Sequence, residues 1–210
     1  MFLPPSFRKD DPGLLHEAIR RTGLATLVTY GPDGLMASHI PLLLDPAPAP
    51  LGKLIGHVSR ANRQWSGFTP DVPALAIFLG PDAYISPSWY ATKRMTGKVV
   101  PTWNYVAVHA YGRLSAFEDA ERLLALVSGL TEREESSRAR PWAVTDAPPK
   151  YIEAQLRGIV GLELTIERLE GKWKMSQNRP AEDAAGVVDG LLAEGAKEVA
   201  HLVAEENGPS

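Results

Sequence analysis

Apolar and polar residues alternate with a period of two along much of this chain, which predicts β-strands with one buried face. The longest such segment is Val99–Phe117, where Trp103 and Tyr105 share one face while Asn104 and Val106 share the other. Further strands are expected at Leu24–Tyr30, Leu35–Leu44, Leu54–Val58, Pro73–Gly80, Ala83–Ile85, Gly158–Leu169 and Gly171–Gln177, with a turn at Glu170–Gly171 between the last two. The turn residues Gly31–Gly34 join the first two of these strands into a predicted hairpin.

Helical spacing of apolar residues is confined to fewer segments, which are expected at residues 12–22, Glu118–Leu130, Pro149–Arg157 and Ala181–Glu206. Strands outnumber helices, and no alternation of strand and helix indicates a parallel sheet. The pattern therefore predicts a mainly β protein of the α+β class, an antiparallel barrel with peripheral helices. We expect residues 1–180 to form the barrel domain with helical insertions and residues 181–210 to form a C-terminal helical tail.

Composition is that of a soluble globular protein: the 210 residues are 44% hydrophobic and 22% charged, and none is cysteine. No apolar run approaches the roughly 20 residues of a membrane helix, and the first residues do not resemble a signal peptide. The sequence therefore predicts a cytoplasmic protein without disulfides or membrane spans. The net charge of −3 argues against a large nucleic-acid footprint, although a basic middle segment suits a small anionic ligand or an unevenly charged surface.

Two polar clusters lie inside or directly after the predicted strands. The first contains Ser38 and His39, which fit either a ligand site or the end of a strand with a satisfied histidine. The second runs from Gly56 to Trp65 and contains His57, Ser59, Arg60 and Asn62. Its hydroxyl and guanidinium groups, together with the free backbone N–H groups at a helix start, suit a phosphate. A capped surface helix is the alternative for this second cluster.

A third cluster combines aromatic, amide and basic side chains. It contains Trp89, Lys98, Thr102, Trp103 and Asn104. Aromatic faces beside amide and hydroxyl groups suit a planar heterocycle, but they also suit stacked nucleic-acid bases or an aromatic barrel core.

Motifs of common hydrolases are absent from the sequence, including Gly-x-Ser-x-Gly and His-Glu-x-x-His. The five histidines lack the spacing of metal ligands, so no metal site is predicted. No catalytic residue is assigned, and the sequence leaves open whether the protein is an enzyme.

The order of several motifs is more specific than any one of them. They are Ser38-His39-Ile40-Pro41, Gly56-His57-Val58-Ser59-Arg60-Ala61-Asn62, Ser86-Pro87-Ser88-Trp89-Tyr90, Val100-Pro101-Thr102-Trp103-Asn104-Tyr105 and Lys174-Met175-Ser176-Gln177-Asn178-Arg179. In this order they resemble the PaiB family, described as FMN-binding negative transcriptional regulators of bacteria. The resemblance extends from the N-terminus to about Leu192.

The resemblance implies a flavin-binding split barrel, similar to that of the pyridoxamine-phosphate oxidases, with FMN at the interface of a homodimer. It also implies negative control of transcription, or sensing of redox state or flavin supply, with DNA contacted directly or through another protein. A flavin-dependent oxidoreductase acting on a small organic substrate is the alternative, since the cofactor would carry the redox chemistry.

The last motif contributes Gln177 and Arg179 to the predicted cofactor site. The amide of Gln177 can both donate and accept hydrogen bonds, as the edge of a flavin ring requires, and Arg179 could hold negative charge near N1 of a reduced flavin. The alternative for this segment is a polar turn before the C-terminal helix.

Overall fold

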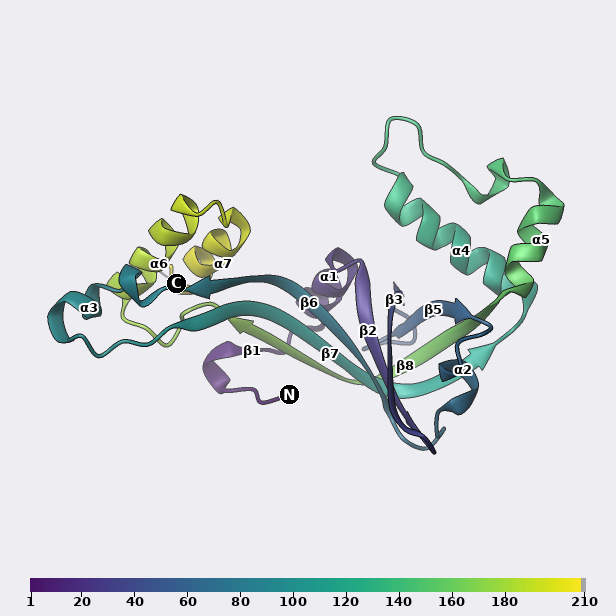
Figure 1. Cartoon of the computed structure of the whole chain (residues 1–210), viewed down its shortest axis with the longest axis horizontal. Helices are drawn as coiled ribbons and strands as arrows, with labels where there is room; N and C mark the ends of the chain where they lie inside the picture. The colour runs from purple at the N-terminus through teal and green to yellow at the C-terminus, as the bar shows by residue number, and fades with distance from the viewer. Residues whose placement is uncertain (209–210) are drawn as a thin grey trace. The chain divides into compact units, whose positions relative to one another are not determined.

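The computed structural model describes residues 1–208 of the chain (Figure 1). Its strands are β1 (Arg8–Lys9), β2 (Leu24–Gly31), β3 (Gly34–Pro41), β4 (Leu43–Asp45), β5 (Lys53–Ser59), β6 (Ala74–Ile85), β7 (Thr102–Phe117) and β8 (Ile159–Lys174). Its α-helices are α1 (Pro12–Arg21), α2 (Gln64–Gly67), α3 (Ala91–Thr96), α4 (Ala120–Glu135), α5 (Pro149–Arg157), α6 (Ala181–Ala193) and α7 (Lys197–Asn207). Short 3₁₀ turns are η1 (Pro5–Phe7), η2 (Pro87–Trp89) and η3 (Val144–Asp146).

The strands form one sheet in the order β3-β2-β6-β7-β8-β5-β4, with β1 paired to β8. Two compact units share this sheet. The barrel unit comprises Pro12–Phe78 and His109–Leu169, and the terminal unit comprises Met1–Asp11, Leu79–Val108 and the chain from Glu170 onward. Antiparallel strands with helices outside the sheet confirm the predicted α+β class.

In the barrel unit, β2 and β3 form the predicted hairpin. Their register runs from Gly31 opposite Gly34 at the turn to Leu24 opposite Pro41 at the far end. Ala25 and Leu27 are buried on the inner face of β2, as the alternation requires.

In the barrel unit, β3 and β5 touch but are not joined by a ladder of backbone hydrogen bonds. Among the described residues, β3 forms a ladder with β2 alone. A Cβ atom at Gly56 would lie only 2.8 Å from the carbonyl oxygen of Pro41, so glycine permits the two backbones to touch. The Nδ2 of Asn62 donates to the Oγ of Ser38 across the same gap, at 2.9 Å. The barrel is therefore split between these strands.

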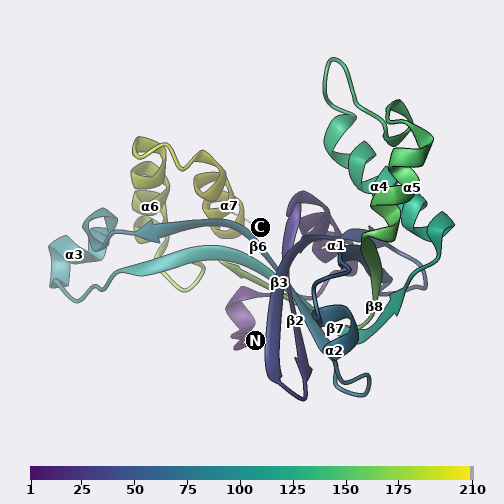
Figure 2. The same ribbon diagram turned by 45° about the vertical axis from the view of Figure 1, so that its right-hand side comes forward.

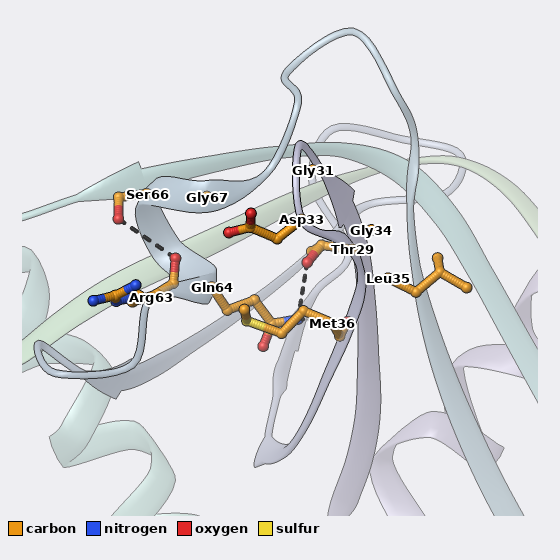
Figure 3. A pocket seen from close by; sticks show the side chains of 10 residues that line it. All are labelled: Thr29, Gly31, Asp33, Gly34, Leu35, Met36, Arg63, Gln64, Ser66 and Gly67. Carbon is orange, nitrogen blue, oxygen red and sulfur yellow. Dashed lines mark hydrogen bonds between the residues drawn. The ribbon is translucent and has the colours of Figure 1, made fainter.

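The short helix α2 is bonded to the β2–β3 hairpin through Gln64, which is only 1% exposed. The Nε2 of Gln64 donates to the carbonyl oxygens of Leu27 (3.0 Å) and Met36 (3.3 Å) and to the Oγ1 of Thr29 (3.1 Å). Figure 3 shows this side chain directed at the hairpin, beside a cavity of about 230 Å³. One amide thus joins α2 to both strands of the hairpin.

Helices α4 and α5 lie side by side in the barrel unit (Figure 2). Helix α4 buries Leu123, Leu126 and Leu130 on one face. Near its end, the guanidinium of Arg133 donates to the carbonyl oxygens of Leu42 (2.8 Å) and Gly23 (3.1 Å). These bonds fasten the helix to the ends of the strands.

In the terminal unit, α6 packs against η2 through a surface that lacks side chains. A Cβ atom at Gly190 would lie 2.2 Å from the Trp89 indole, and one at Gly186 would lie 2.1 Å from the Trp89 carbonyl oxygen. The buried Asp183 of the same helix accepts a hydrogen bond from the backbone N–H of Thr92 (2.8 Å), in the first turn of α3. Helix α6 therefore holds both η2 and α3.

The structure differs from the sequence-based expectations mainly in strand length. The two segments expected at Pro73–Gly80 and Ala83–Ile85 form the single strand β6, and the turn expected at Glu170–Gly171 lies inside the continuous strand β8. The expected C-terminal helix is divided into α6 and α7 at Gly195, whose φ is +80°. No helix within residues 1–208 is long and apolar enough to span a membrane.

Candidate functional site

A groove of about 730 Å³ opens on the barrel unit where β3 and β5 meet without a ladder. It is lined by Ala37, Ser38, His39, Ile40, His57, Val58, Ser59, Asn62, Gln155, Gly158 and Ile159. His57 and Ser59 alternate with the buried Val58 along β5, and all three residues line the groove. Five residues predicted from sequence thus lie around one groove: Ser38, His39, His57, Ser59 and Asn62.

The polar side chains of the groove are held by hydrogen bonds across its walls. The Oγ of Ser38 accepts from Asn62, while a ring nitrogen of His39, Nδ1, lies 3.0 Å from the Oγ1 of Thr26 on the neighbouring strand. The His39 ring is exposed and fixed in orientation by this bond. It is therefore available to a ligand in the groove.

His57 differs from His39 because part of its ring is buried. Its Nδ1 atom is inaccessible to solvent and has no hydrogen-bond partner. Burial lowers the pKa of His57, since desolvation disfavours the charged imidazolium. Glu134 and Glu135 of α4 line a second cavity beside this ring, yet burial remains the cause that sets the direction of its pKa. The imidazole is consequently neutral at pH 7.

In the turn after β5, several backbone N–H groups already donate to acceptors of the protein. The Ser59 Oγ accepts from the N–H of Ala61 (3.3 Å), and the Asn62 Oδ1 accepts from the N–H of Gln64 (2.9 Å). The N–H of Arg60 donates to the carbonyl oxygen of Gly158 (2.8 Å). The free donors expected for a phosphate at this helix start are therefore already occupied by the protein.

Arg60 is also engaged within the barrel unit. Its Nε donates to the carbonyl oxygen of Arg157 (2.8 Å), and its guanidinium pairs with Glu118 (2.5 Å). This side chain therefore lies against the end of α5 and does not line the groove. The role of Arg60 in holding phosphate stays a prediction.

Three other predicted residues, Thr102, Trp103 and Asn104, lie on alternate faces of β7 in the terminal unit. Asn104 is buried, with 1% exposure, whereas Trp103 is exposed and meets the Tyr84 ring edge-on at 6.0 Å. The Nδ2 of Asn104 donates to the Oγ of Ser176 (2.9 Å), and its Oδ1 has no partner. Thr102 accepts a hydrogen bond from the ammonium of Lys174.

The segment from Lys174 to Arg179 forms a tight turn. Ser176 adopts a φ of +66°, a left-handed conformation uncommon for a residue with a side chain. The Oε1 of Gln177 accepts from the N–H of Met175 (2.7 Å). Its Nε2 donates to the carbonyl oxygen of Trp173 (2.7 Å) and to the carboxylate of Glu206 on α7 (3.1 Å). The Arg179 guanidinium lies over the Tyr90 ring, 4.6 Å from its centroid.

Trp89 and Lys98 have different surroundings. The Trp89 indole rests against Gly190 of α6, whereas Lys98 is exposed. The predicted residues thus form two sets, one around the groove of the barrel unit and one in the terminal unit. Sequence reasoning missed Thr26, which orients His39, and the groove residues Gln155, Gly158 and Ile159, because no motif links these distant segments to β3.

The groove fits a flavin by size and by chemistry. Ligand sites in proteins commonly measure about 300–1,000 Å³ and combine apolar walls with a few polar groups. Here the apolar walls include Ile40, Val58 and Ile159, while Ser38 and Asn62 supply polar atoms. The unpaired side of β3 adds backbone groups that can bond the polar edge of a planar ring.

Comparison with known proteins adds sequence and fold evidence. Residues 1–168 match the family described as "Putative FMN-binding domain". The chain is 32% identical over 209 residues to "Protease synthase and sporulation protein PAI 2" of Bacillus subtilis, covering 98% of both chains. It is also 36% identical over 223 residues to the protein AFUA_5G13800 of Aspergillus fumigatus, covering 85% of each, so such relatives are not confined to bacteria.

A likeness to solved structures supports the same fold. The conserved hypothetical protein Rv2991 of Mycobacterium tuberculosis aligns with a TM-score of 0.60 at 13% sequence identity, covering 86% of this chain and 94% of that one. Together with the sheet described above, this likeness confirms the predicted split-barrel fold. Sequence and structure therefore agree over most of the chain.

Proposed function

This chain belongs to the family of FMN-binding domains, and on that premise we propose that its bound FMN serves as a redox- or flavin-responsive signal in negative control of transcription. The relative from B. subtilis supports this proposal, because it matches 98% of the chain and its name associates it with protease synthesis and sporulation. A regulator of this kind would act in the cytoplasm.

The observation that carries the proposal is the groove of the barrel unit. It gathers residues from three separate segments, which are β3, β5 with the turn at Asn62, and residues 155–159, around an unpaired strand edge. In the proposed complex, Ser38, His39 and Asn62 hold the polar edge of the flavin, and His57 contributes a neutral imidazole. FMN supplies the redox chemistry, while these side chains bind and orient it.

We further propose that a second copy of the chain packs on the outer face of the β2–β3 hairpin and completes the groove. This face exposes apolar side chains: Leu35 is 76% exposed and Tyr30, directly opposite it, is 50% exposed. Ala37 and His39 continue the same face of β3 and line the groove. A partner on this face would therefore lie next to the flavin, as the family resemblance implies.

DNA would be reached directly or through another protein. The net charge of −3 favours the indirect route, because direct binding relies on many contacts from lysine and arginine to phosphates. The oxidised and the reduced flavin in such a complex would make different contacts with the groove. This difference would change the affinity of the chain for DNA or for the DNA-binding protein.

A second function, flavin-dependent oxidation or reduction of a small organic substrate, is supported by His39. This exposed imidazole lies in the groove and is oriented by Thr26, as a group that exchanges protons with a flavin or a substrate must be. We also propose that the remaining predicted residues, all of which lie in the terminal unit, contact a flavin: Trp89, Lys98, Thr102, Trp103, Asn104, Gln177 and Arg179.

Three measurements on purified protein test these functions. Saturation with FMN should quench flavin fluorescence and, at 100 times the dissociation constant, stabilise the folded state by about 2.7 kcal/mol. Specific retardation of DNA at physiological salt that changes on flavin reduction would support the regulator. Sustained turnover of a reduced nicotinamide, with no effect of flavin on DNA retention, would instead support the oxidoreductase.

A further inference from the structure

Three cations of the terminal unit have only neutral partners. Lys172 is 7% exposed; its ammonium donates to the carbonyl oxygen of Phe2 (3.1 Å) and lies 5.2 Å from the centre of the Tyr105 ring. Lys174 donates to the Oγ1 of Thr102 and to the carbonyl oxygen of Trp103. Arg179 lies over the aromatic ring of Tyr90.

This arrangement contrasts with the rest of the described chain. Several other bonded cations lie against carboxylates, as in the pairs Lys9–Glu206 (2.7 Å), Lys53–Glu163 (3.3 Å) and Arg60–Glu118 (2.5 Å). Within residues 1–208, no carboxylate forms an ion pair with Lys172, Lys174 or Arg179. None of these three cations is therefore ion-paired with a carboxylate of the described chain.

The other two cations also act on Lys174. Burial, Lys172 and Arg179 all lower the pKa of Lys174. Like charges gathered in a partly buried region cost free energy that a counter-charge would offset. The backbone around them is constrained, because Ser176 between Lys174 and Arg179 is held at a φ of +66° and is bonded to Asn104. The cluster is thus built before any ligand arrives.

We propose that Lys172, Lys174 and Arg179 form an oxyanion site that binds a phosphate group. Lysine supplies a compact charge and arginine a planar pair of donors, which together suit the tetrahedral oxygens of phosphate. The buried Lys172 acts through its charge, whereas the partly exposed Lys174 and Arg179 supply contacts. The phosphate has two sources with the same chemistry, the phosphate of FMN and a separate phosphate-bearing ligand.

The first test uses the apo-protein and inorganic phosphate, so it does not depend on the proposed function. Phosphate should raise the melting temperature above that in chloride of equal ionic strength, and the shift should saturate. Lys174→Met and Arg179→Gln should each weaken phosphate about tenfold or more, the expected effect of losing a charge-assisted hydrogen bond. Lys150→Met, an exposed lysine of α5, is the matched control and should bind phosphate as the wild type does.

Lys174→Arg keeps the charge and should retain phosphate binding, which separates a lost anion site from a damaged fold. Circular dichroism checks that each variant is folded. The proposal is overturned if wild-type protein melts identically in phosphate and chloride, or if Lys174→Met and Arg179→Gln both keep the full phosphate shift.

The second test identifies the source of the phosphate by comparing FMN with riboflavin, which lacks it. If Lys174→Met weakens FMN at least tenfold more than riboflavin, the site holds the phosphate of the cofactor. If it weakens both flavins equally while binding of free phosphate is lost, the site holds a separate phosphate ligand. A protein that binds phosphate but neither flavin would refute the proposed function and leave the oxyanion site standing.

Discussion

The contact between Trp89 and α6 allows a quantitative prediction for Gly190→Ala. Alanine is about 1 kcal/mol better than glycine inside a helix, so propensity alone would stabilise the variant. The new methyl group would, however, lie 2.2, 2.4 and 2.5 Å from three atoms of the indole. Overpacking costs about 1–3 kcal/mol, and we expect about 3 here because the ring is rigid. The net loss is then about 2 kcal/mol.

The assay is the free energy of unfolding from urea titration, followed by circular dichroism. In a chain of this size, a loss of about 2 kcal/mol corresponds to a melting temperature lower by about 4–8 °C. Gly129→Ala is the matched control, because residue 129 also lies inside a helix and its methyl would meet only the flexible Cδ1 of Leu43, at 3.0 Å. It should gain about 0.5–1 kcal/mol.

A double variant isolates the contact. In a Trp89→Ala background the obstacle is gone, so Gly190→Ala should become stabilising by about 1 kcal/mol. If Gly190→Ala stabilises the wild type as much as Gly129→Ala does, the indole does not rest on α6 and the reasoning is wrong.

Three further predictions concern the barrel unit. Asn62→Ala removes the bond to Ser38 across the groove and should weaken FMN about 2–10-fold in a fluorescence titration, with an unchanged circular dichroism spectrum; wild-type affinity would place the flavin elsewhere. Leu35→Lys puts a charge on the exposed hairpin face and should convert dimers to monomers in sedimentation, whereas a persistent dimer would assign the interface to another surface. The pKa of His57 is lower in the folded state than its unfolded value of 6.5, so the unfolded state binds more protons and the free energy of unfolding falls as the pH drops below 6.5. His57→Gln should reduce this loss between pH 7 and 5. Identical pH dependence of the free energy of unfolding in the variant and the wild type would contradict this prediction.

Local pattern predicted much of the fold but misplaced breaks within long strands. The hairpin and the alternation of β7 followed from the sequence, and Asn104 and Trp103 indeed lie on opposite faces. The turn expected at Glu170–Gly171 was wrong because Gly171 pairs with Lys9 of β1, a partner 162 positions away that keeps the strand extended. Tertiary pairing therefore overrode a local turn signal.

The break expected near Pro81 fails for a related reason. Strand β2 pairs with β6 only at Leu75, Ala76 and Ile77, so the later part of β6 has no β2 partner that would need the missing N–H of proline. A turn-forming residue is tolerated there without ending the strand.

The sequence motifs predicted which residues lie at the candidate site, but not which hydrogen bonds their side chains form. Five of the residues that were chosen from the motifs line one groove. The partner of the Arg60 guanidinium, Glu118, is distant in sequence, and the Gln177 amide is used by its own turn. Which polar groups remain for a ligand depends on such partners, and sequence position alone does not reveal them.

The amide of Gln64 has a consequence for folding fidelity. A one-residue slip of β3 against β2 would exchange the two faces of β3, turning the side chain of His39 inward and that of Ile40 outward. It would also move the Met36 carbonyl oxygen away from the Nε2 of Gln64, which bonds β2 at the same time. The hydrogen bonds of Gln64 therefore favour the correct register of β3 against β2. Although Gln64 does not line the groove, the side chains that β3 presents there depend on it.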